Sequence, residues 1–100
     1  MPQENTSTRE RKKVIVSEPK KYKVIMHNDD VTTMDFVVEV LTRIFFKSAK
    51  EAESLMLLIH NEGQAIVGVY PYDVAQSKVF KVKRKAQEQK FPLKLTIEEA

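Results

Sequence analysis

The residues best suited to chemistry form two short polar clusters that lie far apart in the chain. One cluster is Asn28-Asp29-Asp30, and the other is His60 with Asn61 and Glu62. An asparagine oxygen, a carboxylate and a neutral imidazole nitrogen all accept hydrogen bonds. Together they suit a primary ammonium, which carries three donors and a positive charge. The two clusters therefore predict a site for a charged amine if the fold brings them together.

Apolar side chains stand beside both clusters. Met34 follows the first cluster, and Met56 and Ile59 precede the second. Methionine packs adaptably against rings and branched chains, so these residues predict a pocket for an apolar group. An amine joined to a large apolar group is what the first residue of a peptide looks like, and we expect such a ligand.

The elements that must position these residues follow from periodicity and capping. Residues 22–27 alternate as a strand, and a helix follows with Thr32 as its predicted cap and Asp35 as the capping-box partner. Ser48 and Glu51 predict a second capping box, and Gly63 ends that helix. We expect the two helices to run antiparallel, which would bring the start of the first near the end of the second. Their predicted inward residues are Met34, Val37, Val38, Leu41, Ile44 and Phe45, then Ala52, Leu55, Met56 and Ile59.

The rest of the chain predicts a strand at 65–69, a third helix and a last strand. The third helix turns Ala75, Val79, Val82 and Ala86 inward, and the last strand alternates Leu93, Leu95 and Ile97. The order is β-α-α-β-α-β. This predicts an α+β sandwich in which a three-stranded antiparallel sheet packs against three helices. Residues 1–20 are polar apart from Val14-Ile15-Val16 and predict a flexible, disordered arm before a folded domain at 21–100.

Composition excludes several classes of protein. The 100 residues, 42% hydrophobic and 31% charged, are typical of one soluble globular domain. There is no cysteine, which excludes disulfides, thiolate metal sites and cysteine nucleophiles. The net charge of +3 is too mild to indicate a nucleic-acid-binding protein by itself. No apolar run approaches the ~20 residues that span a bilayer, and we expect a cytoplasmic protein.

Two other functions stay open on residue chemistry alone. His27, His60, Asp29 and Asp30 are permissible zinc or iron ligands and would suit a metal-dependent hydrolase, although no established metal-site spacing supports them. The basic residues of the third helix and of the arm would suit a small nucleic-acid-binding domain.

Several joined motifs resemble the ClpS adaptors of ATP-dependent Clp proteases. Residues 22–30, with the sequence YKVIMHNDD, and residues 32–37, with the sequence TTMDFV, are similar to the opening motif of that family. The resemblance continues through Ala52, Met56-Leu57, His60 and Gly63. Further matches are Gly68-Val69-Tyr70, residues 75–78 and Pro92-Leu93, so the resemblance covers residues 22–100 in register.

The resemblance implies an adaptor, not an enzyme, that binds proteins beginning with Leu, Phe, Tyr or Trp and delivers them to the ClpA or ClpC unfoldase. It implies that Asn28, Asp30 and His60, with Asp29 beside them, hold the α-amino group. Met34 would disfavour β-branched first residues, and the side-chain pocket would be formed by Thr32, Met34, Val37, Met56, Ile59 and Leu93. Asp73 and Lys78 would face the amino-terminal domain of the unfoldase, and residues 1–20 would serve in handover. This interpretation involves no metal, cofactor, nucleic acid or membrane, and it predicts a monomer.

Overall fold

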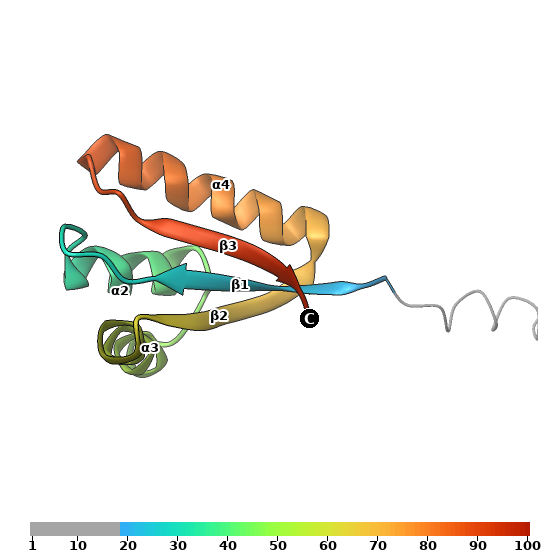
Figure 1. Ribbon diagram of the computed structural model, residues 1–100, viewed down its shortest axis with the longest axis horizontal. Coiled ribbons are helices and arrows are strands. Elements are labelled where there is room, and N and C mark those ends of the chain that lie inside the picture. Colours follow the sequence, from blue (N-terminus) through green and yellow to red (C-terminus); the bar gives the residue numbers. More distant parts are fainter. Residues whose placement is uncertain (1–18) are drawn as a thin grey trace, which may run out of the picture.

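The computed structural model describes residues 19–100. Its elements are β1 Lys21–His27, α2 Met34–Arg43, α3 Ala49–Glu62, β2 Gln64–Pro71, α4 Tyr72–Gln89 and β3 Lys94–Glu99 (Figure 1). This order confirms the predicted β-α-α-β-α-β arrangement. The predicted arm lies almost wholly outside the described residues, as does its apolar triplet Val14-Ile15-Val16.

The three strands form one antiparallel sheet in the order β2-β1-β3, so β1 is the central strand. α4 packs against all three strands and α3 packs against β2, and Figure 1 shows α4 along β3 and α3 beside β2. The alternation in β1 explains this arrangement, because Val24 and Met26 are fully buried against the helices. Ile25 points to the opposite face and is nevertheless only 5% exposed, between strand partners Ile66 and Thr96.

The third helix confirms its predicted inward face in full. Ala75, Val79, Val82 and Ala86 are all buried, and α4 packs across all three strands.

Each fully buried side chain of the size of valine or methionine contributes about 1.5–3 kcal/mol to the free energy of unfolding. Among the helices of residues 19–100, none combines the length and the apolar character that a membrane crossing requires.

The first helix begins one residue later than predicted. Its N-cap is Thr33, whose hydroxyl oxygen accepts a hydrogen bond from the Phe36 N–H at 3.2 Å. The prediction of Thr32 as the cap was wrong, and no capping box forms with Asp35, because the Thr32 hydroxyl is already bonded to Asp29. The helix also buries Phe36 and Val40, which the predicted inward set omitted.

The second helix was predicted more accurately. The Ser48 side chain accepts from the Glu51 N–H, and the Glu51 carboxylate accepts from the Ser48 N–H, which confirms the capping box. The helix ends at Gly63, which has a left-handed backbone with φ 92°. The strand predicted at 65–69 is longer and runs over Gln64–Pro71.

The packing of α2 and α3 differs from the prediction. Figure 1 shows α2 lying across the view while α3 is seen along its axis, so the two helices cross steeply and do not run antiparallel. The apolar faces of both helices still contribute to one core, which includes Val37, Leu41, Ala52 and Ile59.

Replacing Gly63 tests whether the left-handed backbone at the end of α3 requires glycine. We expect Gly63→Ala to lower the free energy of unfolding by about 1–2 kcal/mol, because a side chain disfavours the left-handed conformation. A Cβ at this position would meet no atom within 4 Å, so the loss comes from the backbone and not from a clash. Urea unfolding measures the change, and Gly63→Asn should lose less, since asparagine tolerates this conformation better. Equal stability of Gly63→Ala and the unchanged protein would contradict this account.

Candidate functional site

The sheet brings the two polar clusters together. His27, the last residue of β1, pairs with Gln64, the first residue of β2. The next residue outward on each side continues the pairing, because the Asn28 N–H donates to the Gly63 carbonyl at 2.8 Å. Gly63 ends α3, so His60 lies about one helical turn from this bond. The clusters were predicted to meet through antiparallel helices, but the β1–β2 register is what joins them.

A cavity of about 260 Å³ lies at this junction. Nine of the twelve residues that were predicted to have a site role line this cavity. They are Asn28, Asp29, Asp30, Thr32, Met34, Val37, Met56, Ile59 and His60. The cavity therefore joins polar residues of the β1–α2 turn to residues of α2 and α3 that are far away in sequence.

Three residues with predicted roles do not line this cavity. Leu93 is buried in the core just before β3, where it is 7% exposed. Asp73 is exposed in the first turn of α4. Lys78 lies further along the same helix, and its ammonium contacts the connection between α2 and α3.

The carboxylate of Asp29 is engaged in the turn itself. Its Oδ1 accepts from the Val31 N–H at 2.8 Å and from the Thr32 N–H at 2.7 Å, while its Oδ2 accepts from the Thr32 hydroxyl at 2.7 Å. Partial burial raises the pKa of this carboxyl, but the hydrogen bonds from Thr32 and Val31 outweigh that effect and hold the pKa below its ordinary value. Asp29 is therefore ionised at neutral pH and fixes the shape of the turn.

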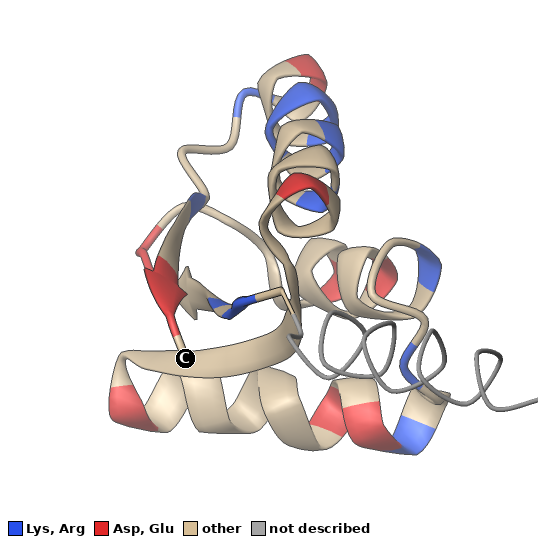
Figure 2. Ribbon diagram, turned by 90° about the vertical axis from the view of Figure 1, so that its right-hand side faces the viewer, with Lys and Arg blue, Asp and Glu red and all other residues tan. Residues whose placement is uncertain are grey.

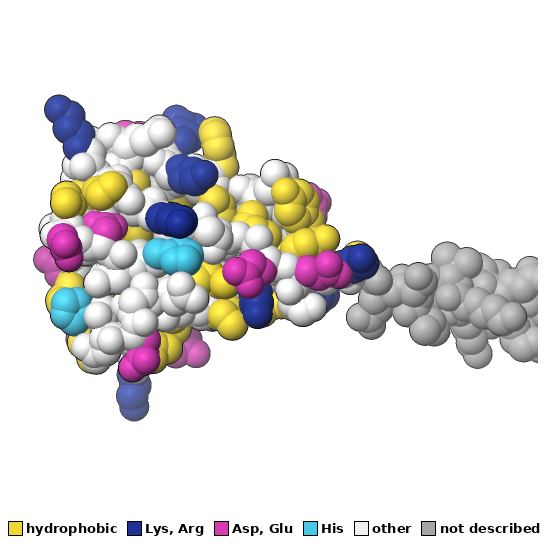
Figure 3. Space-filling model, in the orientation of Figure 1, with side chains coloured by type: hydrophobic (Ala, Val, Ile, Leu, Met, Phe, Trp, Pro, Cys, Tyr) yellow, Lys and Arg dark blue, Asp and Glu magenta, His cyan; other side chains and the backbone are white. Residues whose placement is uncertain are grey.

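The other acceptors of the site face the solvent. The side chains of Asn28, Asp30 and His60 are exposed, and none of them is hydrogen-bonded to another residue within 19–100. Figure 3 shows acidic side chains and a histidine at the end of the molecule where β1 leads into α2. This arrangement offers an amide oxygen, a carboxylate and an imidazole to a ligand without first breaking an internal bond.

The apolar part of the cavity has a rigid floor and an adaptable mouth. Val37 and Ile59 are buried in the core, at 7% and 2% exposure, and Met56 is half-buried. Met34 is 45% exposed in the first turn of α2. A flexible thioether at the mouth can adjust to side chains of different shape.

A metal centre finds no support among the described residues. No three histidine, aspartate or glutamate side chains of residues 19–100 are grouped closely enough to hold a metal ion. The ring Nε2 of His27 lies 2.9 Å from the Thr96 hydroxyl, and His27 does not line the cavity. The histidines therefore do not act as a pair.

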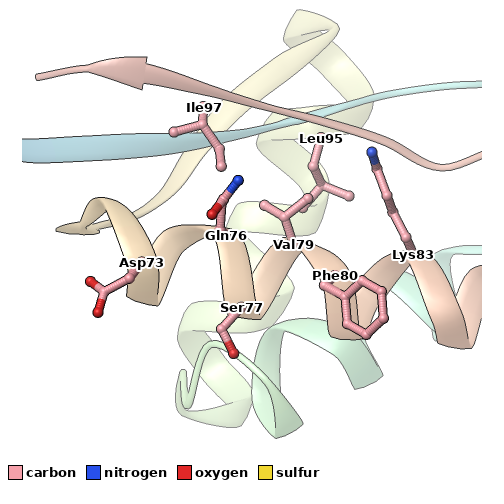
Figure 4. A pocket seen from close by; sticks show the side chains of 8 residues that line it. All are labelled: Asp73, Gln76, Ser77, Val79, Phe80, Lys83, Leu95 and Ile97. Atoms are coloured by element: carbon pink, nitrogen blue, oxygen red, sulfur yellow. The ribbon is translucent and has the colours of Figure 1, made fainter.

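A larger groove of about 700 Å³ lies between α4 and β3, with Phe80, Leu95 and Ile97 among its lining (Figure 4). Its two charged residues, Asp73 and Lys83, stand at opposite ends, as Figure 4 shows. The smaller cavity is the better candidate for recognition, because its polar acceptors converge on one place beside an apolar floor.

Comparison with known proteins defines the class. Residues 17–96 match the family described as "ATP-dependent Clp protease adaptor protein ClpS". The ClpS adapter of Wolinella succinogenes is 55% identical over 89 residues, covering 89% of this chain and 87% of the relative. The adapter of Acetivibrio thermocellus is 47% identical over 95 residues, covering 95% of this chain and 96% of the relative.

Solved structures agree with this assignment. The structure of Agrobacterium tumefaciens ClpS2 bound to L-phenylalaninamide superposes with a TM-score of 0.79 at 36% identity, covering 83% of this chain and all of the other. The fold and the site thus define a small α+β adaptor of the Clp protease system. The chain belongs to the ClpS family, which confirms the resemblance found in the sequence.

Asp29 makes the stability of the turn depend on pH. A carboxyl with a lowered pKa stabilises the folded state above its unfolded pKa of about 3.9, and this contribution is lost as the pH falls through the folded pKa. We expect Asp29→Asn to lower the free energy of unfolding by about 1–2 kcal/mol at pH 7 and by progressively less below about pH 4.

Urea unfolding of both proteins between pH 7 and pH 2 measures this difference. Glu53→Gln, an exposed change on α3, serves as the control and should leave the pH dependence unchanged. A difference between Asp29→Asn and the unchanged protein that stays constant over this range would show that the Asp29 charge does not stabilise the turn.

Proposed function

We propose that this protein binds the amino termini of proteins that begin with Leu, Phe, Tyr or Trp and delivers them to a ClpA or ClpC unfoldase for degradation. The observation that carries the proposal is the convergence of Asn28, Asp30 and His60 on one cavity with an apolar floor. An α-amino group and the side chain attached to it would occupy the polar and the apolar part of this cavity together.

The polar part supplies the charge recognition. Asn28 and His60 each offer an acceptor, and Asp30 offers an acceptor with a negative charge, while a protonated α-amino group offers three donors. Charge-assisted hydrogen bonds contribute roughly 1.5–3 kcal/mol each. Asp29 is better suited to hold the turn than to bind the amine directly, because both of its oxygens already accept hydrogen bonds.

The apolar part supplies the selection for a bulky side chain. Burying a Leu or Phe side chain against Val37, Met56 and Ile59 contributes about 1.5–3 kcal/mol. The relative solved with L-phenylalaninamide supports this assignment, because that molecule has a free α-amino group and a benzyl side chain. Both features are the ones that the cavity of this chain is suited to hold.

The proposed mechanism forms and breaks no covalent bond. Delivery would follow from docking of the unfoldase's amino-terminal domain near Asp73 and Lys78 on α4, with residues 1–20 serving in handover in the cytoplasm. The metal-dependent hydrolase is not favoured, because no three histidine, aspartate or glutamate side chains of residues 19–100 are grouped so as to hold a metal ion.

The ammonium contacts are tested by titrating a labelled Phe-first peptide and following its fluorescence anisotropy. We expect Asp30→Ala and His60→Ala each to weaken binding about 10–100-fold, which corresponds to the loss of one charge-assisted hydrogen bond. Acetylation of the peptide amine should abolish binding, since it removes the charge. Asp73→Ala removes an equal charge outside the cavity and should bind the peptide normally. Unchanged affinity in either cavity variant would refute the role of that residue.

The mouth of the cavity is tested by Met34→Ala. A β-branched first residue carries its bulk close to the backbone, and Met34, which lines the cavity from the first turn of α2, would oppose that bulk. We therefore expect Ile-first and Val-first peptides to bind several-fold more tightly to Met34→Ala, while the affinity for a Phe-first peptide changes less. Equal affinities of both proteins for the Val-first peptide would show that Met34 does not select against branching.

A further inference from the structure

Phe46 combines an exposed aromatic side chain with an unfavourable backbone conformation. Its side chain is 77% exposed, more than any other large hydrophobic side chain among residues 19–100. Its backbone is left-handed, with φ 55°, a conformation that is uncommon for a bulky residue. The fold thus exposes an aromatic ring to the solvent at a position where glycine would suit the backbone better. Neither the exposure of the ring nor the left-handed backbone contributes to the packing of the core.

Lys78 fixes the segment that carries this ring. From α4, its Nζ donates to the carbonyl of Ile44 at 2.7 Å and lies 4.5 Å from the centre of the Phe46 ring. The same ammonium lies 5.2 Å from the Tyr70 ring and 5.9 Å from the Phe45 ring. A hydrogen bond and two cation–π contacts therefore tie the α2–α3 connection to α4, and the third cation–π contact ties α4 to Tyr70 of β2, so the ammonium is directed into its own fold.

Basic residues lie near Phe46 in the chain and in a neighbouring groove. Arg43 and Lys47 flank it in the chain, and a groove of about 330 Å³ between the end of α2 and α4 is lined by Arg43, Ile44, Lys81, Arg84, Lys85 and Glu88. Figure 2 shows Lys and Arg on α4 and along the connection from α2 to α3. Charge complementarity thus calls for an acidic occupant.

We propose that Phe46 and this basic groove, together called the Phe46 surface, are a docking site for a folded protein domain that receives the ring in an apolar hollow with an acidic rim. An exposed aromatic anchor within a charged rim is the usual make-up of a binding hot spot. A protein is favoured over a nucleic acid, because Glu88 lies in the groove and Lys85 is within 3.7 Å of Glu39. Lys78 is a positioning residue, which acts on the partner through Phe46.

The Phe46 surface leaves the ammonium cavity free. That cavity lies at the start of α2, and the Phe46 surface lies beyond its end. The ten residues of the helix separate the two by about 15 Å. Both sites can therefore be occupied at once, as an adaptor requires. The inference rests on the proposed function for one point only, namely that the docked domain belongs to the unfoldase.

The first experiment measures the affinity of the full chain for the isolated amino-terminal domains of ClpA and ClpC. Phe46→Gly removes the ring and relieves the backbone, so we expect unfolding stability to be unchanged or higher while affinity for the cognate domain falls at least tenfold. Affinity for a Phe-first peptide should not change. Leu57→Ala is the control, because that side chain is also exposed, at 47%, but lies on α3 and lines neither the ammonium cavity nor the basic groove.

The outcomes separate this inference from the proposed function. Domain binding that is equal in Phe46→Gly and the unchanged protein overturns the Phe46 surface and leaves peptide recognition intact. If the unchanged protein fails to bind the Phe-first peptide, the proposed function is overturned. The effect of Phe46→Gly on binding of the unfoldase domain still tests the Phe46 surface in that case. An unchanged protein that binds neither domain overturns both delivery and this inference. Binding of a labelled oligonucleotide that is lost in Phe46→Gly, with domain binding unaffected, would assign the surface to nucleic acid.

A second experiment tests the role of Lys78. Lys78→Met keeps the length of the side chain but removes the donor, so we expect weaker domain binding, and Lys78→Arg should restore most of it. If Lys78 acts through the ring, Lys78→Met has little further effect once Phe46→Gly is present. An equal loss in both backgrounds would show that the ammonium contacts the partner directly and would refute the positioning role.

Discussion

The candidate site depends on one backbone hydrogen bond, from the Asn28 N–H to the Gly63 carbonyl. This bond extends the β1–β2 pairing by one step beyond His27 and Gln64, and it sets the turn after β1 against the end of α3. Because β1 is also the central strand, the core fixes the place of Asn28 and Asp30 through Val24 and Met26. The candidate site residues of this turn are thus positioned by the end of the sheet.

The two aspartates of the turn differ in how their carboxylates are used within the fold. Both carboxylate oxygens of Asp29 accept hydrogen bonds from Val31 and Thr32, so Asp29 fixes the shape of the turn. Asp30 is exposed to solvent, which avoids the large cost of burying an unpaired charge. Like Asp29, Lys78 uses its charged group for a hydrogen bond within the fold, from its Nζ to the Ile44 carbonyl.

Local patterns predicted most of the fold, and packing decided the rest. The strand β1, the Ser48–Glu51 capping box and the inward face of α4 depend on neighbours in sequence, and all were found as predicted, although Ile25 in β1 is buried along with Val24 and Met26. Two adjacent threonines could each cap α2, and only the bond from Thr32 to Asp29 decides for Thr33. The steep crossing of α2 and α3 and the contact of Lys78 with Ile44 leave no local signal, because they join segments far apart in the chain. Nine of the predicted site residues share one cavity, although the sheet and not the helix pair assembles it.

The pairing of β1 with both of its neighbours limits how the length of this protein can vary during evolution. Inserting or deleting one residue in β1 would turn Val24 and Met26 toward the open face of the sheet or move Asn28 away from Gly63. Each such change in β1 would cost either the core or the cavity, whereas β2 already accommodates an extra residue opposite Val24 and Ile25, where the pairing register shifts. Members that share this architecture should therefore keep the length from Lys21 to Asp30 constant and place their insertions elsewhere, for example beyond α4 around Lys90.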